Sequence, residues 1–180
     1  MTERELSSET IQTFGLGLCQ KGLLNGRIAI PIHNATGQLV AYAGRWPGTA
    51  DKEKYLFPKG FRKSLELFNL HRALQAPVDR PLIIVEGFFD CMKLWQFGVQ
   101  RVVGLMGSSM SGAQEELIRQ HTDFRSQILV MLDEDDAGRA GREEIARRLA
   151  PWFFVKIHVF EKAGTQPDQL SAEEVAALVR

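Results

Sequence analysis

The sequence predicts an α/β protein in which a mainly parallel sheet is flanked by helices and preceded by a small α+β basic subdomain. From Pro81 onward, short apolar runs alternate with amphipathic stretches, a pattern typical of parallel strands joined by helical crossovers. Ahead of that region, two β-rich runs flank a loop with Asn and Gly, which favours an antiparallel hairpin. The stretch 75–81 contains two prolines and no apolar periodicity. We therefore assign residues 1–78 to the small subdomain and 79–180 to the α/β domain.

Each expected element follows from a local pattern. Ser7 or Ser8 can cap a short helix over 9–14, which the following glycines end. The hairpin strands are expected over 27–32 and 38–43. The elements expected in the larger domain are a strand over 82–86, a helix over 88–97, a strand over 101–107, a helix over 111–121, a strand over 127–133, a helix over 138–149 and a strand over 154–160.

Composition narrows the class of protein. Hydrophobic residues make up 44% of the 180 residues and charged residues 24%, which indicates a globular protein with a real core. The 22 Lys and Arg residues balance the 22 Asp and Glu residues, so the bulk charge points to neither a nucleic acid nor a membrane. No apolar run could span a bilayer and the first residues are polar, which predicts a cytoplasmic protein without a membrane partner. Isolated cysteines and scattered histidines support neither a disulfide framework nor a zinc ribbon.

Acidic residues follow two of the predicted parallel strands. Glu86 ends the first strand, and Asp90 lies one helical turn further on the same face. Asp133 ends the third strand and is followed by Asp135. Because the carboxyl ends of parallel strands meet at one edge of a sheet, Glu86 and Asp133 should converge there. A dense group of hard oxygen ligands favours Mg²⁺ or Mn²⁺ over zinc.

A simpler interpretation is that acids after strands only cap the helices that follow, where negative charge is stabilising. For a single strand-end acid this interpretation is the stronger one. Two strand ends together with an Asp-x-Asp favour a metal site instead. Glu134 and Asp136, which flank the alternating pair, are expected to be caps or solvated residues.

A basic stretch runs from Arg45 to Lys63. Its six cations against two acids give it a local charge of +4, and aromatic residues are interleaved among them. Such a mixture can hold phosphates and stack bases, and a solvated loop with a few core aromatics explains it equally well. The glycine- and serine-rich stretch 104–112 could present N–H groups to a phosphate, or simply cap the next helix.

These motifs resemble those of a known family. Val85-Glu86-Gly87-Phe88-Phe89-Asp90, followed by Asp133-Glu134-Asp135 and Ala137-Gly138-Arg139, resembles the two signature motifs of the Toprim fold in bacterial replicative DNA primases. Upstream, GRIAIPIHNATGQLVAYAGR is similar to the primase segment that precedes the Toprim domain. The order and spacing of the motifs are specific, although each alone is weak. The resemblance extends from about Glu5 to Leu170 and implies a Toprim-type sheet.

The resemblance implies roles for individual residues. The implied catalytic carboxylates are Glu86, Asp133 and Asp135, the implied metal ligands are Glu86, Asp90, Asp133, Asp135 and Asp168, and the implied nucleic-acid or nucleotide contacts are Arg45, Lys54 and Lys63. Two positions depart from the family pattern. Gln166-Pro167-Asp168 keeps only the second acid of an Asp-Pro-Asp motif, so the outer metal position lacks one of the acids that the family pattern has there. Glu134 stands where primases usually have glycine.

The implied activity is metal-dependent synthesis of RNA primers on single-stranded DNA from nucleoside triphosphates, with Mg²⁺ or Mn²⁺ as cofactor. A replicative helicase or other domains of a longer chain are further expected partners. Neither the zinc ribbon nor the helicase-binding helices of a full primase are recognised, so we interpret the sequence as a fragment, a domain of a longer chain or a minimal version. Phosphodiester cleavage, as in Toprim nucleases, and a non-catalytic module that binds single-stranded DNA or a replication partner stay open as alternatives.

Overall fold

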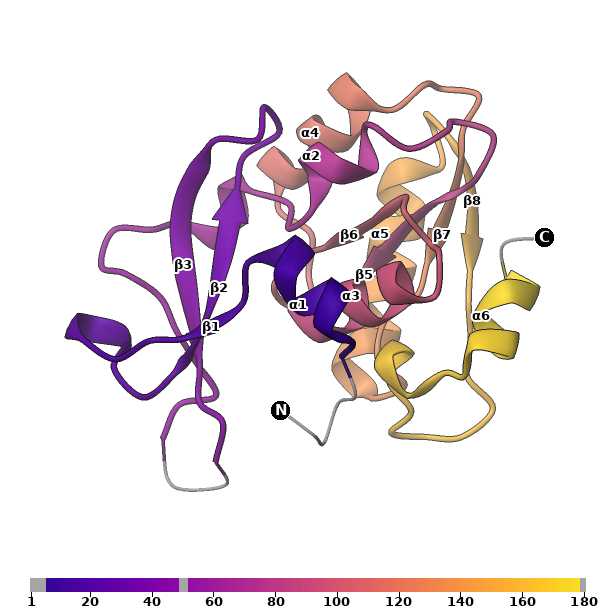
Figure 1. Ribbon diagram of the computed structural model, residues 1–180. Helices are drawn as coiled ribbons and strands as arrows, with labels where there is room; N and C mark the ends of the chain where they lie inside the picture. Colours follow the sequence, from indigo (N-terminus) through magenta and orange to yellow (C-terminus); the bar gives the residue numbers. More distant parts are fainter. Residues whose placement is uncertain (1–5, 49–51, 179–180) are drawn as a thin grey trace.

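The computed structural model describes residues 6–48 and 52–178, which form two sheets and the helices around them (Figure 1). The first sheet is antiparallel, with strand order β1-β2-β3-β4. The second is parallel throughout, with strand order β6-β5-β7-β8. The predicted α/β class, with a parallel sheet preceded by a small α+β subdomain, is confirmed.

The first part of the chain builds the antiparallel sheet. Its elements are α1 (Ser8–Phe14), β1 (Gly17–Leu18), the 3-10 turn η1 (Gly22–Leu24), β2 (Ile28–His33), β3 (Leu39–Arg45), β4 (Tyr55–Leu56), the 3-10 turn η2 (Lys63–Leu65) and α2 (Leu70–Ala73). Ser7 caps α1 by accepting a hydrogen bond from the N–H of Thr10. Asn34 closes the β2–β3 hairpin, because its Oδ1 accepts the N–H groups of Thr36 and Gln38.

The rest of the chain builds the parallel sheet. Its elements are β5 (Leu82–Val85), α3 (Phe88–Gln96), β6 (Val102–Gly104), α4 (Gly112–His121), β7 (Gln127–Val130), α5 (Asp136–Leu149), β8 (Phe154–Ile157), the 3-10 turn η3 (Pro167–Gln169) and α6 (Ala172–Leu178). Every strand and helix expected here from the sequence is present, within a few residues of its predicted bounds. The strands β1 and β4 and the helix α6 were not predicted.

Helices cover both faces of the parallel sheet because side chains alternate along each strand. Ile83 and Val85 of β5 pack on the side of α1, α3 and α6. Leu82 and Ile84 pack on the side of α2, α4 and α5. Within the described residues, no helix is long and apolar enough to cross a bilayer.

The two sheets share one core. The inward residues of β2 belong to the same apolar cluster as Ile83 and Val85. Phe68 lies at the junction, with ring centroids 5.7 Å from Phe14 and 4.8 Å from Phe88, and it pairs with Gly104 of β6 through backbone hydrogen bonds. The division of the chain at residue 78 stays a prediction. The shared core holds the basic small sheet firmly beside the parallel sheet.

Candidate active site

The strand order of the parallel sheet creates a crevice between β5 and β7. After β5 the chain crosses to β6 on one side, and after β7 it crosses to β8 on the other. Ligands of open α/β sheets bind at such a switch point, beyond the carboxyl ends of the strands. Glu86 directly follows β5 and Asp133 follows β7, so both acids lie at this point.

Glu86 and Asp133 are in direct contact. The backbone N–H of Asp133 donates a hydrogen bond to Oε1 of Glu86 at 3.1 Å. Gly138, in the first turn of α5, lies against both residues. A Cβ at position 138 would stand 2.0 Å from the carbonyl oxygen of Asp133 and 2.9 Å from Oε1 of Glu86. The helix can therefore begin this close to the strand ends only because residue 138 is glycine.

Asp90 completes the group from α3. Its side chain is nearly buried, and its Oδ2 accepts the backbone N–H of Gly87 at 2.8 Å. A Cβ at Gly87 would lie 2.6 Å from that oxygen, so glycine is required for this contact as well. Asp90 thus caps α3 and points its carboxylate toward the strand ends, as its spacing from Glu86 predicts.

These acids share a cavity of about 360 Å³ with residues of the small sheet. Five of the predicted site residues line it: Lys54, Lys63, Glu86, Asp90 and Asp133. Aromatic side chains of the basic stretch, Tyr55 and Phe57, form part of its wall. The fold therefore brings cations from the segments beside β4 and in η2, and carboxylates from the end of the parallel sheet, to one opening.

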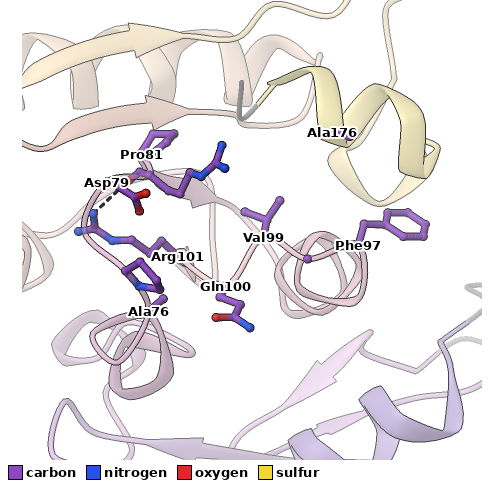
Figure 2. A pocket seen from close by; sticks show the side chains of 11 residues that line it. Ala76, Asp79, Pro81, Phe97, Val99, Gln100, Arg101 and Ala176 are labelled. Carbon is purple, nitrogen blue, oxygen red and sulfur yellow. Dashed lines mark hydrogen bonds between the residues drawn. The ribbon is translucent and has the colours of Figure 1, made fainter.

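A larger cavity, of about 590 Å³, lies at the opposite edge of the parallel sheet, where β5 and β6 begin (Figure 2). Its buried cation is Arg101, whose Nη1 donates to the carbonyl oxygens of Val78 at 3.0 Å and Arg80 at 2.7 Å. That arginine holds the segment before β5 in place. Size alone would favour this cavity, but the smaller one is where the strand-end carboxylates gather.

The electrostatics of the smaller cavity disfavour negative charge. Burial, together with the nearby charge of Asp133, raises the pKa of Glu86 to about 7. Burial also raises the pKa of Asp133 to about 6, with Asp90 adding to the rise and a hydrogen bond from Gln166 opposing it. Acids held in this state gain stability when a cation neutralises them.

The geometry of Asp133 fits a divalent cation. Its Oδ1 is buried and has no hydrogen-bond partner in the described part of the chain. The donors around it are carboxylate oxygens, which suit Mg²⁺ or Mn²⁺. Among residues 6–48 and 52–178, no three acidic, histidine or cysteine side chains lie close enough to form a complete metal site as they stand. A cation here would complete its shell with water or with a rotated carboxylate, and Mg²⁺ usually keeps several waters.

Two predicted ligands are not part of the cavity wall. Asp135 is exposed and caps α5, since its Oδ1 accepts the N–H of Gly138 at 2.8 Å. Its charge nevertheless contributes to the raised pKa values of Glu86 and Asp133. Asp168 is half-buried in η3, which packs beside α3. The structure shows a capping role for Asp135, and metal ligation by either residue stays a prediction.

The three predicted phosphate contacts occupy different positions. Lys54 is exposed at the cavity. Lys63 donates to the carbonyl oxygen of Met106 at 2.8 Å, and Met106 has a left-handed backbone conformation with φ of 61°. Arg45 lies outside the cavity wall, with its guanidinium 4.8 Å from the ring of Phe89 and 5.3 Å from that of Tyr55. The loop 104–112 ends in a helix cap, because Ser111 accepts the N–H of Gln114.

The expectation that Glu134 is a cap or a solvated residue is wrong. Its side chain is 7% exposed and forms an ion pair with Arg142, at 2.5 Å between Nη1 and Oε2. Hydrogen bonds from Arg142 lower the pKa of Glu134 to about 2. The carboxylate turns away from the cavity because it finds its partner inside α5. Asp136, by contrast, is fully exposed, as expected.

Gln166 is a site residue that sequence reasoning treated only as a missing acid. Its Nε2 donates to Oδ2 of Asp133 at 2.6 Å, and its side chain lines the cavity. The signal was present in the sequence as the departure from Asp-Pro-Asp. That an amide there would bind Asp133 depends on the path of the loop after β8, which no local pattern specifies.

A small antiparallel sheet followed by a four-stranded parallel sheet has counterparts among known proteins. Residues 83–170 match a family described as Toprim-like, and residues 21–74 match the N-terminal domain of the DNA primase catalytic core. The chain belongs to the bacterial DNA primase family. The resemblance inferred from the sequence motifs is therefore confirmed.

Individual primases show how far this likeness extends. The DNA primase of Haemophilus influenzae is 40% identical over 118 residues, which cover 63% of this chain and 19% of that protein. The zinc-binding and RNA polymerase domains of the Aquifex aeolicus primase align with a TM-score of 0.84 and 23% identity, over 98% of this chain and 53% of that one. A DnaG primase catalytic domain solved bound to single-stranded DNA aligns with a TM-score of 0.78 and 24% identity, over 96% of this chain and 66% of that one. The two solved structures establish the shared fold, and this chain spans only part of each of these primases.

Proposed function

We propose that this chain is a primase catalytic core, which synthesises RNA primers on single-stranded DNA by metal-dependent nucleotidyl transfer. The observation that carries the proposal is the cavity that Glu86 and Asp133 share with Lys54 and Lys63. Nucleotidyl transfer develops charge on phosphate oxygens, so it needs cations at the phosphates and acids that hold a metal beside them. Membership of the primase family supports the same activity.

The carboxylates would hold Mg²⁺ or Mn²⁺, with Glu86 and Asp133 as the central pair. Asp90, Asp135 and Asp168 are the further candidate ligands. The bound ion would help to activate the primer 3′-hydroxyl and neutralise charge on the departing pyrophosphate. The chain itself positions these acids through Gly87 and Gly138, and no side-chain nucleophile is needed.

The cations of the basic stretch from Arg45 to Lys63 would bind the polyanionic substrates. Lys54 and Lys63 lie within the cavity and suit the phosphates of a nucleoside triphosphate or of the primer end. Arg45, stacked on Tyr55 and Phe89 just outside, suits a phosphate of the template strand. The primase domain solved with single-stranded DNA supports a template of that kind. A replicative helicase or other domains of a longer chain are proposed as partners on the same grounds of family membership.

Primer synthesis tests the proposal directly. The protein is incubated with a single-stranded template, nucleoside triphosphates and Mg²⁺ or Mn²⁺, and a 5′-labelled single strand is assayed in parallel for cleavage. We expect short RNA products that depend on metal. Cleavage without synthesis would indicate a Toprim nuclease, since the same carboxylates could activate water. Template binding without either product would indicate a binding module.

The salt dependence of template binding tests the lysines. Each phosphate contact on single-stranded DNA contributes roughly 0.7 to the slope of log affinity against log salt. Replacing both Lys54 and Lys63 by Ala should therefore reduce the slope by about 1.4. Lys162, exposed in the segment after β8, provides the matched control, and Lys162→Ala should leave the slope unchanged. Equal slopes for all three proteins would place the DNA contacts elsewhere.

A further inference from the structure

The two oxygens of Asp133 have different surroundings. Oδ2 accepts a hydrogen bond from the side-chain amide of Gln166 at 2.6 Å. Oδ1 is buried and lacks a partner within the described residues. One oxygen is therefore held by the protein, while the other is desolvated and lacks the partner that a ligand of positive charge would supply.

Gln166 is itself held by the loop after β8, which is fastened to Glu134. The N–H of Glu134 donates to the carbonyl oxygen of Thr165 at 2.9 Å, and the N–H of Gly164 donates to the carbonyl oxygen of Glu134 at 2.8 Å. Near the start of the loop, the N–H of Phe160 donates to Oε2 of Glu134 at 3.1 Å. The backbone and the side chain of Glu134 thus hold both ends of the segment that leads to Gln166.

Arg142 fixes Glu134 in turn. Its two terminal nitrogens contact the two carboxylate oxygens of Glu134 at 2.5 and 3.1 Å, and both side chains are less than a tenth exposed. A buried ion pair is weak evidence for stability, because desolvation offsets the attraction. Here the two charge-assisted hydrogen bonds from Arg142 hold the carboxylate of Glu134 in one orientation. This pair lies one residue from Asp133 and is satisfied without using any oxygen of the cavity.

We propose that Gln166 is a positioning residue that binds Oδ2 of Asp133 and so reserves Oδ1 for a divalent cation, with Glu134 and Arg142 anchoring it. The proposal rests on the proposed function, since it assumes that the cavity holds the metal. An amide suits this role because it donates a hydrogen bond without adding negative charge beside Glu86 and Asp133. Partners that orient a metal ligand in this way typically contribute 10- to 100-fold to metal affinity.

Mn²⁺ binding by the complete chain provides the test, measured by calorimetry and by the electron paramagnetic resonance signal of free Mn²⁺. Gln166→Met keeps the size of the side chain and removes the donor. We expect its dissociation constant for Mn²⁺ to rise about tenfold or more. Glu161→Gln, an exposed change in the same segment, is the matched control and should bind as the wild type does. Melting temperatures without metal should be similar for the wild type and both variants. A purely structural role of Gln166 would instead lower the melting temperature of Gln166→Met and leave its affinity for Mn²⁺ unchanged.

A second variant tests the anchor independently. Glu134→Gln keeps both the size and one acceptor oxygen but removes the charge that holds Arg142. It should weaken Mn²⁺ binding in the same direction as Gln166→Met, by a smaller factor. If Asp133→Asn abolishes binding while Gln166→Met binds like the wild type, the positioning role is wrong and the metal site stands. If the wild type itself shows no specific Mn²⁺ binding, the proposed function and this inference fail together.

Discussion

The two edges of the parallel sheet use buried charge in opposite ways. At the amino edge, Arg101 is nearly buried, and its Nη1 donates hydrogen bonds to the backbone carbonyl groups of Val78 and Arg80, while its buried Nε has no partner among the described residues. At the carboxyl edge, burial and mutual repulsion raise the pKa values of Glu86 and Asp133, and one buried oxygen has no partner in the described chain. A single cation held by backbone carbonyl groups fastens the fold, whereas several like charges gathered at one opening, with raised pKa values, mark a candidate binding site.

The strongest test of this comparison exchanges one acid at each edge for its amide. Asp133→Asn removes one of the two central carboxylates proposed to hold the metal and should lower the rate of primer synthesis by at least about a hundredfold, because even indirect partners of a metal contribute 10- to 100-fold. Asp79→Asn, in the cavity of Figure 2, should leave the rate within about twofold. Steady-state assays of both variants on the same template decide between the edges. A similar loss of rate in Asp133→Asn and Asp79→Asn would show that the carboxyl edge is not the functional one.

The reverse effect is expected for stability. Arg101→Met keeps the apolar stem and removes the hydrogen bonds to Val78 and Arg80. Urea denaturation should show an unfolding free energy lower by about 2 kcal/mol, the range for hydrogen bonds that involve a charged group. Gln100→Ala, an exposed change in the same cavity, should cost about 0.5 kcal/mol or less. Primer synthesis per folded molecule should be normal in both, and a specific loss in Arg101→Met would give the amino edge a catalytic role.

The pH dependence of stability sharpens the comparison at the carboxyl edge. Glu86 has a pKa of about 7 in the folded protein and an ordinary value of 4.5, so the folded state holds its proton where the unfolded chain has released it. The free energy of unfolding contributed by Glu86 therefore falls as the pH rises through this window. Glu86→Gln should gain stability over the wild type by roughly 1 kcal/mol at pH 8 and by little at pH 4, after allowance for solvent screening.

Urea denaturation of the wild type and of Glu86→Gln at both pH values measures this difference. His71, whose pKa burial lowers to about 4, acts in the opposite direction but is present in both proteins and cancels. Added Mg²⁺ should raise the stability of the wild type at pH 8 more than that of the variant, by mass action. If the difference in unfolding free energy between the wild type and Glu86→Gln is the same at both pH values, the pKa of Glu86 is not raised in the folded protein.

How much of this molecule the sequence predicts depends on the range of the interactions. The alternation after Pro81 predicts the parallel sheet, and the strand-end rule brings Glu86 and Asp133 together, because both depend on local periodicity and on a general property of parallel strands. The strands β1 and β4 have two residues each, too few for any period to show. They form only because β2 and β3 are there to pair with.

The same limit explains the error at Glu134 and the oversight at Gln166. An acid after a strand is normally a cap, and whether it turns inward depends on a partner elsewhere in the fold. For Glu134 the partners are the side chain of Arg142 in α5 and the backbone N–H of Phe160, which follows β8. Gln166 reaches Asp133 across 33 positions of sequence. Such contacts are set by the assembled fold and leave no local pattern.

The smallest expected effect concerns Asp135, which separates a metal ligand from a helix cap at the same edge. Its Oδ1 caps α5 through the N–H of Gly138, and its charge raises the pKa values of Glu86 and Asp133. Asn is itself a good cap, so Asp135→Asn should cost a few tenths of a kcal/mol at most through the cap. Loss of the charge relieves repulsion, so the melting temperature without metal should be equal to or slightly above that of the wild type.

Metal then distinguishes the two roles of Asp135. If it is a ligand, Mg²⁺ should raise the melting temperature of Asp135→Asn less than that of the wild type, because a weaker ligand for the native state stabilises it less at the same concentration. Asp136→Asn is the matched control, since Asp136 is the fully exposed neighbour. Its metal-induced shift should equal that of the wild type. An equal shift in Asp135→Asn as well would leave Asp135 as a cap alone and confine metal binding to Glu86, Asp133 and the acids around them.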